Sequence, residues 1–290
     1  MEPEGFVRFG ALKFYFRSEG EPSKGTLLVM HGGPGYTYDY LTPLFDIAEH
    51  GYQVVIYEQA GSGKSDIPRD PGRYTIESFV EDAEGVRKGL GLGNVHLLGF
   101  SWGGMLAQAY ALRYQRNLKS LILSGTTPSI PLLQREGARL FGELPAGVRE
   151  TITKHEESGE FDAPEYAKAL LEFQRRHTLR ISPVPDPMVY SDAHVNKEVG
   201  RVMFGPHLVE VTGNMRYWDV TDRLHTLRIP CLVTCGEHDF LTPRLHQLMH
   251  NKIKGSKLVI IQGASHIAMW EKRDVYIRTI TGFLDSVMKS

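Results

Sequence analysis

Short apolar runs recur along the chain at intervals that suit a sheet of buried strands. Six of these runs consist mainly of aliphatic and β-branched residues and span residues 27–30, 52–57, 95–98, 121–123, 231–234 and 258–261. Stretches with helical patterns lie between most of them. Near-continuous apolar strands that alternate with helices predict a mainly parallel α/β sheet, covered on both faces and joined by right-handed crossovers.

The beginning of the chain departs from this alternation. Residues 6–9 and 12–16 form two short apolar runs that are joined through Gly10. Two such runs on either side of a glycine-containing turn predict an antiparallel hairpin. We expect this hairpin at the edge of the sheet.

A second departure follows Ser124, since residues 125–230 contain no clear strand. A connection of that length far exceeds an ordinary link between strands, so we interpret it as an insertion. Helical patterns occur in it at residues 131–140, 148–155 and 164–176, before a proline-rich bend at residues 183–187. Open α/β sheets bind ligands at the carboxyl ends of their strands, so we expect the insertion to cover the site and select the substrate.

Ser101 is the candidate nucleophile. It stands between the apolar run at residues 95–98 and a helix-like stretch at residues 105–115, with Gly99 and Gly103 two positions away on either side. A nucleophile elbow holds its serine on a sharp, strained turn from strand to helix, and only small residues fit at those two positions. The same five-residue pattern also arises by chance, and the strand before it and the helix after it favour the functional interpretation.

A glycine-rich segment after the first parallel strand is the candidate oxyanion loop. The apolar run that begins at Thr26 leads into His31-Gly32-Gly33-Pro34-Gly35. Glycines allow the main chain, here at Gly32 and Gly33, to approach a substrate closely, and acyl transfer needs backbone N–H groups aimed at the developing oxyanion. We predict the amides of Gly33 and Trp102 as the two donors.

A serine nucleophile needs a base and a carboxylate that orients the base. His266 lies in the loop after the last strand and Asp239 follows the strand before it, so both stand at carboxyl ends. Glu237 is the nearest competitor for the acid. Asp219 and Asp222 lie at the opposite edge of the sheet. The resulting order of serine, aspartate and histidine is the one that α/β-hydrolases use.

Other motifs are interpreted as structural. Residues 61–65 resemble a phosphate-binding loop, but Glu58 stands where that motif needs glycine, so we predict a turn. His246 and His250 have the spacing of a zinc-protease helix, but Gln247 replaces its glutamate and we expect a surface pair. The sequence indicates no metal and no cofactor.

The charge and the apolar content of the chain exclude several classes of partner. The chain has 290 residues and a formal net charge of −1, without a long basic run, which argues against nucleic acid or an anionic membrane as partner. A small neutral or zwitterionic partner fits better. The first residues lack a signal-like apolar core and no stretch approaches about 18 apolar residues, so we expect a cytoplasmic protein.

The two cysteines, Cys231 and Cys235, lie four positions apart on one predicted strand. Their Cα atoms would be about 13 Å apart, which is too far for a disulfide, so we expect both to be buried thiols.

Together these motifs resemble the proline iminopeptidase (prolyl aminopeptidase) family of α/β-hydrolases over nearly the whole chain. The motifs that carry the resemblance are His31-Gly32-Gly33-Pro34-Gly35, the turn at residues 58–65, the elbow around Ser101, Trp218-Asp219-Val220, Gly236-Glu237-His238-Asp239 with Thr242-Pro243, and Gly263-Ala264-Ser265-His266 with Trp270-Glu271.

The resemblance implies an α/β-hydrolase fold with a mostly parallel eight-stranded sheet, helices on both faces and a helical cap inserted after the sixth strand. The core domain would comprise residues 1–126 and 214–290, and the cap residues 127–213. It also implies a serine hydrolase with a Ser101, Asp239 and His266 triad. The expected substrate is a small molecule or short peptide. The sequence does not determine the oligomeric state, and a monomer is compatible with it.

The chain departs from this family where the family binds the substrate's ammonium group. The resemblance places one glutamate directly after the triad aspartate and another in a Gly-Pro-x-Glu motif, but here these positions hold Phe240 and Leu208. Glu210 lies two residues later and would share a face with Leu208 in an extended segment. One hypothesis is that Glu210 binds the ammonium of a free N-terminal residue such as proline.

Two alternatives remain open at this point. Leu208 and Phe240 would favour a carboxylesterase, amidase or lactonase that acts on uncharged acyl groups. A hydrolase-fold receptor that only binds a small ligand is disfavoured, because all three catalytic residue types stand at the carboxyl ends of strands.

Overall fold

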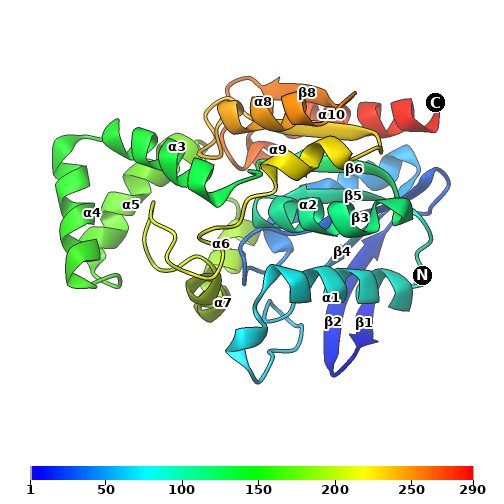
Figure 1. Cartoon of the computed structure of the whole chain (residues 1–290), viewed down its shortest axis with the longest axis horizontal. Helices are drawn as coiled ribbons and strands as arrows, with labels where there is room; N and C mark the ends of the chain where they lie inside the picture. The colour runs from blue at the N-terminus through cyan, green and yellow to red at the C-terminus, as the bar shows by residue number, and fades with distance from the viewer. Residues whose placement is uncertain (1, 290) are drawn as a thin grey trace.

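An eight-stranded sheet forms the centre of the molecule, in the order β1-β2-β4-β3-β5-β6-β7-β8 (Figure 1). The structure is a computed structural model that describes residues 2–289. The strands are β1 (Glu4–Phe9), β2 (Leu12–Glu19), β3 (Gly25–Met30), β4 (Tyr52–Tyr57), β5 (Val95–Phe100), β6 (Leu118–Ser124), β7 (Cys231–Gly236) and β8 (Lys257–Ile261). β1 and β2 form the antiparallel edge, and the six strands from β3 to β8 are parallel to one another. The expected α/β sheet with its edge hairpin is confirmed.

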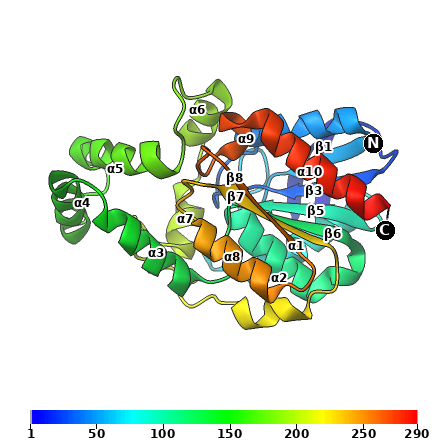
Figure 2. The same ribbon diagram turned by 90° about the horizontal axis from the view of Figure 1, so that it is seen from above.

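Helices cover both faces of this sheet. The core elements outside the sheet are the 3-10 segments η1 (Asp39–His50), η2 (Pro71–Arg73), η3 (Gln115–Asn117) and η4 (Thr221–Thr226), and the helices α1 (Ile76–Gly89), α2 (Trp102–Tyr114), α8 (Pro243–Lys252), α9 (Ala268–Glu271) and α10 (Arg273–Met288). One apolar cluster joins α1, α2 and α8 to the sheet, and a second joins η1 and α10 to the opposite face. Figure 2 shows α10 and α8 on opposite sides of the strands.

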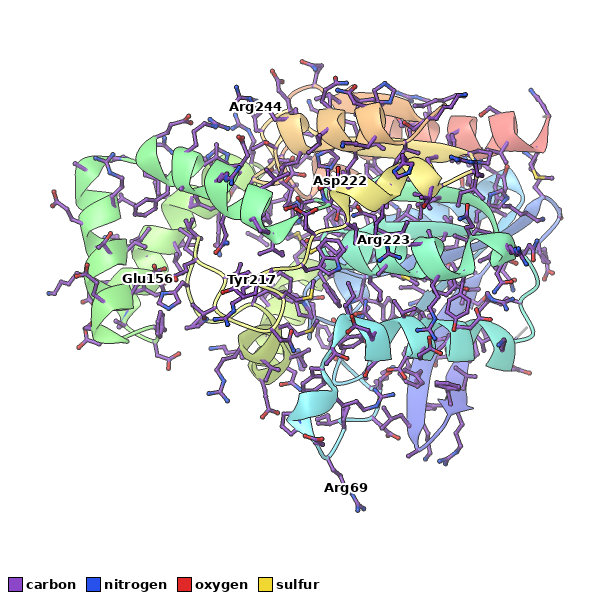
Figure 3. All side chains as sticks on the ribbon, in the orientation of Figure 1. Arg69, Glu156, Tyr217, Asp222, Arg223 and Arg244 are labelled. Carbon is purple, nitrogen blue, oxygen red and sulfur yellow. The ribbon has the colours of Figure 1, made fainter. Side chains whose placement is uncertain are left out.

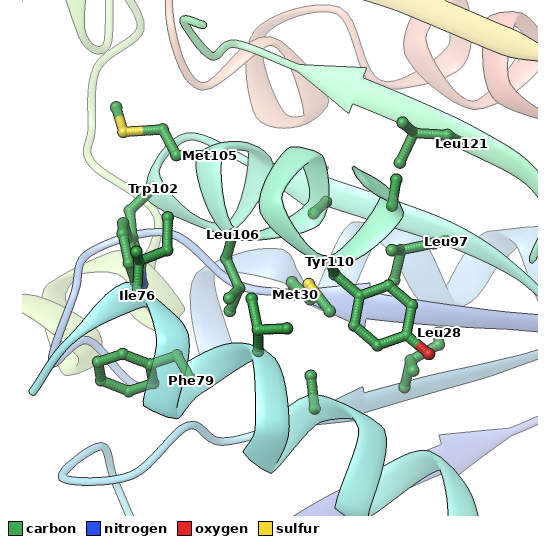
Figure 4. Close-up of a cluster of buried hydrophobic side chains, with 14 of the residues drawn as sticks. Leu28, Met30, Ile76, Phe79, Leu97, Trp102, Met105, Leu106, Tyr110 and Leu121 are labelled. Atoms are coloured by element: carbon green, nitrogen blue, oxygen red, sulfur yellow. The ribbon is translucent and has the colours of Figure 1, made fainter. Parts of the chain in front are cut away.

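The two clusters explain why the parallel strands have no polar alternation. Every residue of β4, β5 and β7 is buried. Successive side chains of a strand point to opposite faces, so Leu97 packs in the first cluster and Leu98 in the second. Figure 4 shows Tyr110 of α2 beside Leu97 of the sheet, and Leu106 and Leu121 belong to the same cluster. A strand that is covered on both faces must be apolar at nearly every position.

Five α-helices stand between β6 and β7 and extend beyond the carboxyl ends of the strands (Figure 1). They are α3 (Ile130–Gly142), α4 (Ala146–Ser158), α5 (Pro164–His177), α6 (Asp186–Ala193) and α7 (Lys197–Met203). The first three match the predicted helices. Helices α3 to α5 also share a small apolar cluster that is separate from the two sheet clusters. The proposed division of the chain at residues 127–213 remains a prediction.

The proline-rich segment differs from the simple bend that the sequence predicts. Pro187 lies in the first turn of α6, where proline is tolerated because the N–H groups there have no partner within the helix. The bend therefore ends in a two-turn helix, and α7 follows after a short link.

Two further expectations concern the cysteines and membranes. Cys231 and Cys235 are both buried and unpaired on β7, and burial raises the pKa of the Cys231 thiol to about 12. Among residues 2–289, no helix has the length and apolar character that crossing a membrane requires.

Candidate active site

Ser101 lies at the junction of β5 and α2 in a strained backbone conformation. Its φ of 57° and ψ of −123° make it the one non-glycine residue with positive φ among residues 2–289. Its amide donates to Ser124 O at 3.0 Å, and its carbonyl accepts from the Thr126 hydroxyl at 2.8 Å. Such strain costs about 1–3 kcal/mol and persists only where the surroundings enforce it. The neighbouring strand end therefore holds the serine in the elbow geometry.

The glycines of the elbow are required by close packing. A Cβ at Gly99 would lie 2.3 Å from Gly103 O, and a Cβ at Gly103 would lie 2.1 Å from Met30 O. Gly104 is equally confined, since its Cβ would lie 2.5 Å from the Cβ of Thr126. The steric reason that the sequence suggested for Gly99 and Gly103 is confirmed.

The side chains of His266 and Asp239 meet at the carboxyl edge of the sheet. Nδ1 of His266 lies 2.9 Å from Oδ1 of Asp239, and both side chains are buried. A carboxylate acceptor at this distance assigns the proton to Nδ1, which leaves Nε2 as the basic nitrogen. The Asp239 oxygen also accepts from Leu241 N at 2.8 Å. The imidazole ring packs against Phe100 and Phe240, whose ring centroids lie 4.8 and 4.4 Å from its own.

The end of cap helix α5 holds the loop that carries His266. The amide of His266 donates to His177 O at 3.1 Å, and the amide of Ile267 donates to Thr178 O at 3.0 Å. His177 in turn makes a 3.0 Å contact from its Nδ1 to His238 O, one residue before Asp239. The position of the cap and the position of the imidazole are thus coupled.

The segment after β3 approaches Ser101 closely. A Cβ at Gly32 would lie 2.8 Å from the Cβ of Ser101, and the Gly32 amide donates to the Tyr40 hydroxyl at 2.6 Å. Gly33 has a φ of 124° and lines the same cavity as Ser101. Trp102 is the first residue of α2, where amides have no partner within the helix.

Gln59 connects the two segments that flank the serine. Its Oε1 accepts from Trp102 Nε1 at 2.7 Å, and its Nε2 donates to His31 O at 2.7 Å. The Gln59 amide donates to His31 Nε2 at 3.0 Å, and His31 Nδ1 lies 2.7 Å from Gly32 O. Burial lowers the pKa of His31 to about 4, so the ring is neutral and can accept and donate in this way. Sequence reasoning missed this role of Gln59, although it noted the turn that contains it.

The turn after β4 is built around the buried carboxyl of Glu58. Its Oε2 accepts from Lys64 N at 2.6 Å, and a Cβ at Gly63 would lie 2.1 Å from its Oε1. Burial raises the pKa of Glu58 to about 7, and the hydrogen bonds from the amides of Lys64 and Tyr38 offset part of that effect. The turn that the sequence predicts at residues 61–65 is confirmed. The carboxyl of Glu58 occupies the space inside it.

Ser101 and His266 open into one cavity of about 250 Å³ between the sheet edge and the cap. Its wall also includes Gly33 and Phe240 and, from cap helix α6, Asp192. Pockets for drug-sized ligands usually measure about 300–1,000 Å³, so this cavity suits a single small residue.

The structure corrects the expected positions of Leu208 and Glu210. Both line a separate depression in the cap, beside Glu156 of α4, which Figure 3 labels among the outer cap helices. Glu210 is exposed there, and the Leu208 amide donates to Glu156 Oε1 at 2.8 Å. The segment is not simply extended, because Thr212 N donates to Phe204 O and closes it into a loop. Neither side chain lines the cavity that contains Ser101.

His246 also differs from the expectation of a surface pair. It is fully buried, and its Nε2 accepts from Thr126 N at 3.0 Å, beneath the elbow. Across residues 2–289, no group of three or more His, Cys, Asp or Glu side chains is arranged to hold a metal ion.

Comparisons with known proteins agree with the fold. A family model described as the alpha/beta hydrolase fold matches residues 25–273. A protein named proline iminopeptidase from Saccharolobus solfataricus is 39% identical over 287 residues, which cover 98% of this chain and 93% of that protein. The crystal structure of proline iminopeptidase from Mycobacterium smegmatis has a TM-score of 0.91 at 32% identity and 98% coverage of both chains. The crystal structure of VinJ has a TM-score of 0.94 at 30% identity and 99% coverage of both.

Proposed function

Because the chain belongs to the proline iminopeptidase family of α/β-hydrolases, we propose that it is a serine aminopeptidase that releases an N-terminal residue, proline included, from short peptides or amino-acid amides. The observation that carries the proposal is that Ser101, on its strained elbow, shares one small cavity with a histidine that contacts a buried aspartate. This arrangement supports nucleophilic catalysis without a cofactor.

In the acylation step, His266 Nε2 takes the proton of the Ser101 hydroxyl as its oxygen attacks the scissile carbonyl carbon. Asp239 keeps the imidazole in the required tautomer and stabilises its cationic form. The carbonyl oxygen becomes an oxyanion, which the amides of Gly33 and Trp102 bind. His266 then gives the proton to the leaving amine as the amide bond breaks.

Deacylation repeats these roles with water as the nucleophile. His266 removes a proton from the water, which attacks the ester carbonyl of the acyl-enzyme. The tetrahedral intermediate collapses, Ser101 recovers its proton from His266, and the free N-terminal residue leaves. The cavity of about 250 Å³ limits the acyl part to one small residue.

A second candidate function is the hydrolysis of uncharged esters, amides or lactones. Phe240 favours it, because this apolar side chain lines the cavity at the position where the family resemblance implies a glutamate. Leu208 no longer supports this alternative, since it lies outside the cavity.

The test compares kcat/KM for proline p-nitroanilide with kcat/KM for its N-acetyl derivative, in the wild type and in Ser101→Ala. We expect the wild type to prefer the free amine and Ser101→Ala to lose about 10⁴-fold or more on it. Equal rates, or a preference for the blocked compound, would support the second candidate. A wild type as slow as Ser101→Ala on both compounds would contradict both functions.

A further inference from the structure

We infer that Asp192, on cap helix α6, binds the ammonium group of the substrate's free N-terminal residue, an assignment that rests on the proposed aminopeptidase function. Neither the sequence motifs nor the family resemblance points to this residue. The inference comes from its position in the cavity and from the charge of its neighbours.

Helix α6 is attached to the core directly beside the candidate oxyanion loop. Ser191 is buried, and its hydroxyl lies 2.8 Å from the hydroxyl of Thr37, which donates to Asp39 at the start of η1. Met188, four residues before Asp192 and therefore on the same side of the helix, also lines the cavity. These contacts turn one side of α6 toward Ser101.

Asp192 gives this cavity its negative charge. Among the described residues that line the cavity, it is the one acidic side chain, and none is a lysine or arginine. No lysine, arginine or histidine nitrogen in residues 2–289 lies within ion-pair distance of its carboxylate. Asp192 is solvent-exposed where it lines the cavity, and a carboxylate there without a cationic partner attracts a positively charged ligand.

The surroundings of Asp192 also favour a cation. Burial raises the pKa of its carboxyl, and the hydroxyl of Tyr36 offsets part of that effect. A bound ammonium would lower the pKa of this carboxyl again, because an opposite charge stabilises the ionised carboxylate. Tyr36 lines the cavity next to Tyr40, with ring centroids 6.2 Å apart, and aromatic faces attract cations as well.

The chain also provides a matched control for substitutions of Asp192. Glu210 is an acidic cap residue that lies outside the cavity, so it tests whether any nearby negative charge suffices. Asp192→Asn removes the charge and keeps the size of the side chain, and Asp192→Glu keeps the charge.

The experiment measures kcat/KM for proline p-nitroanilide and for its N-acetyl derivative in the wild type, Asp192→Asn, Asp192→Glu and Glu210→Gln. The readout is the ratio of the two values, which reports recognition of the amine and is insensitive to a general loss of active enzyme. We expect Asp192→Asn to lower this ratio by about 10- to 100-fold, as for the loss of a charged hydrogen bond. Asp192→Glu should retain more of the ratio than Asp192→Asn, and Glu210→Gln should not change it.

Inhibition by pyrrolidine, a small protonated secondary amine, gives a second readout that requires no turnover of an amide. It should inhibit the wild type competitively, and Asp192→Asn should weaken that inhibition by a similar factor. A wild-type preference for the free amine that survives in Asp192→Asn would overturn the assignment of Asp192 alone. A wild-type ratio near one would contradict the aminopeptidase function, and the assignment with it.

Discussion

The indole Nε1 of Trp102 donates a 2.7 Å hydrogen bond to Oε1 of Gln59, on the turn after β4. The same amide side chain donates to His31 O at the end of β3. Gln59 thus ties together the two segments whose amides, at Gly33 and Trp102, we propose as oxyanion donors. Its effect on catalysis would be indirect, through the positions of those donors.

Replacing Gln59 by leucine should therefore impair catalysis more than binding. Gln59→Leu leaves the indole N–H and the His31 carbonyl without their buried partner, which costs about 1–3 kcal/mol of unfolding free energy. We expect kcat to fall about 10- to 100-fold and KM to change little, because misplaced donors act on the transition state. The control is Gln53→Leu, a buried glutamine at the other end of β4 that bonds to Thr26. Equal effects of the two variants on kcat would contradict this role.

The elbow should tolerate no side chain at position 103. Gly103→Ala would place its Cβ 2.1 Å from Met30 O, so the helix or the strand must move. Overpacking of this kind costs about 1–3 kcal/mol, and the displaced Ser101 should also lose activity. Gly147→Ala is the matched control, since a Cβ at that helical position meets nothing within 4 Å. Denaturant unfolding checks both variants, and a Gly103→Ala protein as stable as the control would refute the packing account.

Glu58 should make the protein less stable as the pH rises. Its folded pKa of about 7 lies above its usual value of 4.5, so the unfolded chain loses this proton first. The stabilisation is complete below about pH 4.5 and is lost as the pH rises through about 7, by about 3 kcal/mol in total. Glu58→Gln is neutral at every pH.

The difference between the unfolding free energies of Glu58→Gln and wild type should therefore shift by about 3 kcal/mol in favour of the variant between about pH 4.5 and 8. Urea titrations at several pH values measure this difference, in which the other titrating groups cancel. Parallel stability curves for the two proteins would show that Glu58 has the same pKa in the folded and unfolded states and would contradict the account.

Asp239 and Ser101 should behave as parts of one unit. Asp239→Asn can present a donor to His266 Nδ1 and favour the wrong tautomer, so we expect kcat to fall by about 10⁴-fold. In the double variant with Ser101→Ala, the loss should not exceed that of Ser101→Ala alone, because residues that act together are not additive. Single and double variants measured on one substrate test this. Losses that multiply would indicate independent roles.

The sheet and the elbow were predictable because local patterns determine them. A buried parallel strand needs an apolar run, and a serine at positive φ between closely packed segments needs glycines at positions 99 and 103. His266 and Asp239 follow from the rule that carboxyl ends of parallel strands share one edge.

The residues that sequence reasoning missed depend on contacts between distant segments. Asp192 lies on a two-turn helix that docks through the pair of Ser191 and Thr37, which are 154 positions apart. The burial of His246 depends on Thr126, 120 positions away. Glu210 was misplaced because a turn closes the segment that we expected to be extended. No local periodicity encodes such contacts.

The most direct test of the central claim is to detect the acyl-enzyme on Ser101. Proline p-nitrophenyl ester acylates rapidly, so its reaction should show a burst of nitrophenol, and acid quenching should trap the intermediate. Peptide mapping by mass spectrometry should then find a prolyl group on Ser101, and Ser101→Ala should give neither burst nor adduct. Steady turnover of the ester with no adduct on Ser101, or an adduct on another residue, would contradict the account.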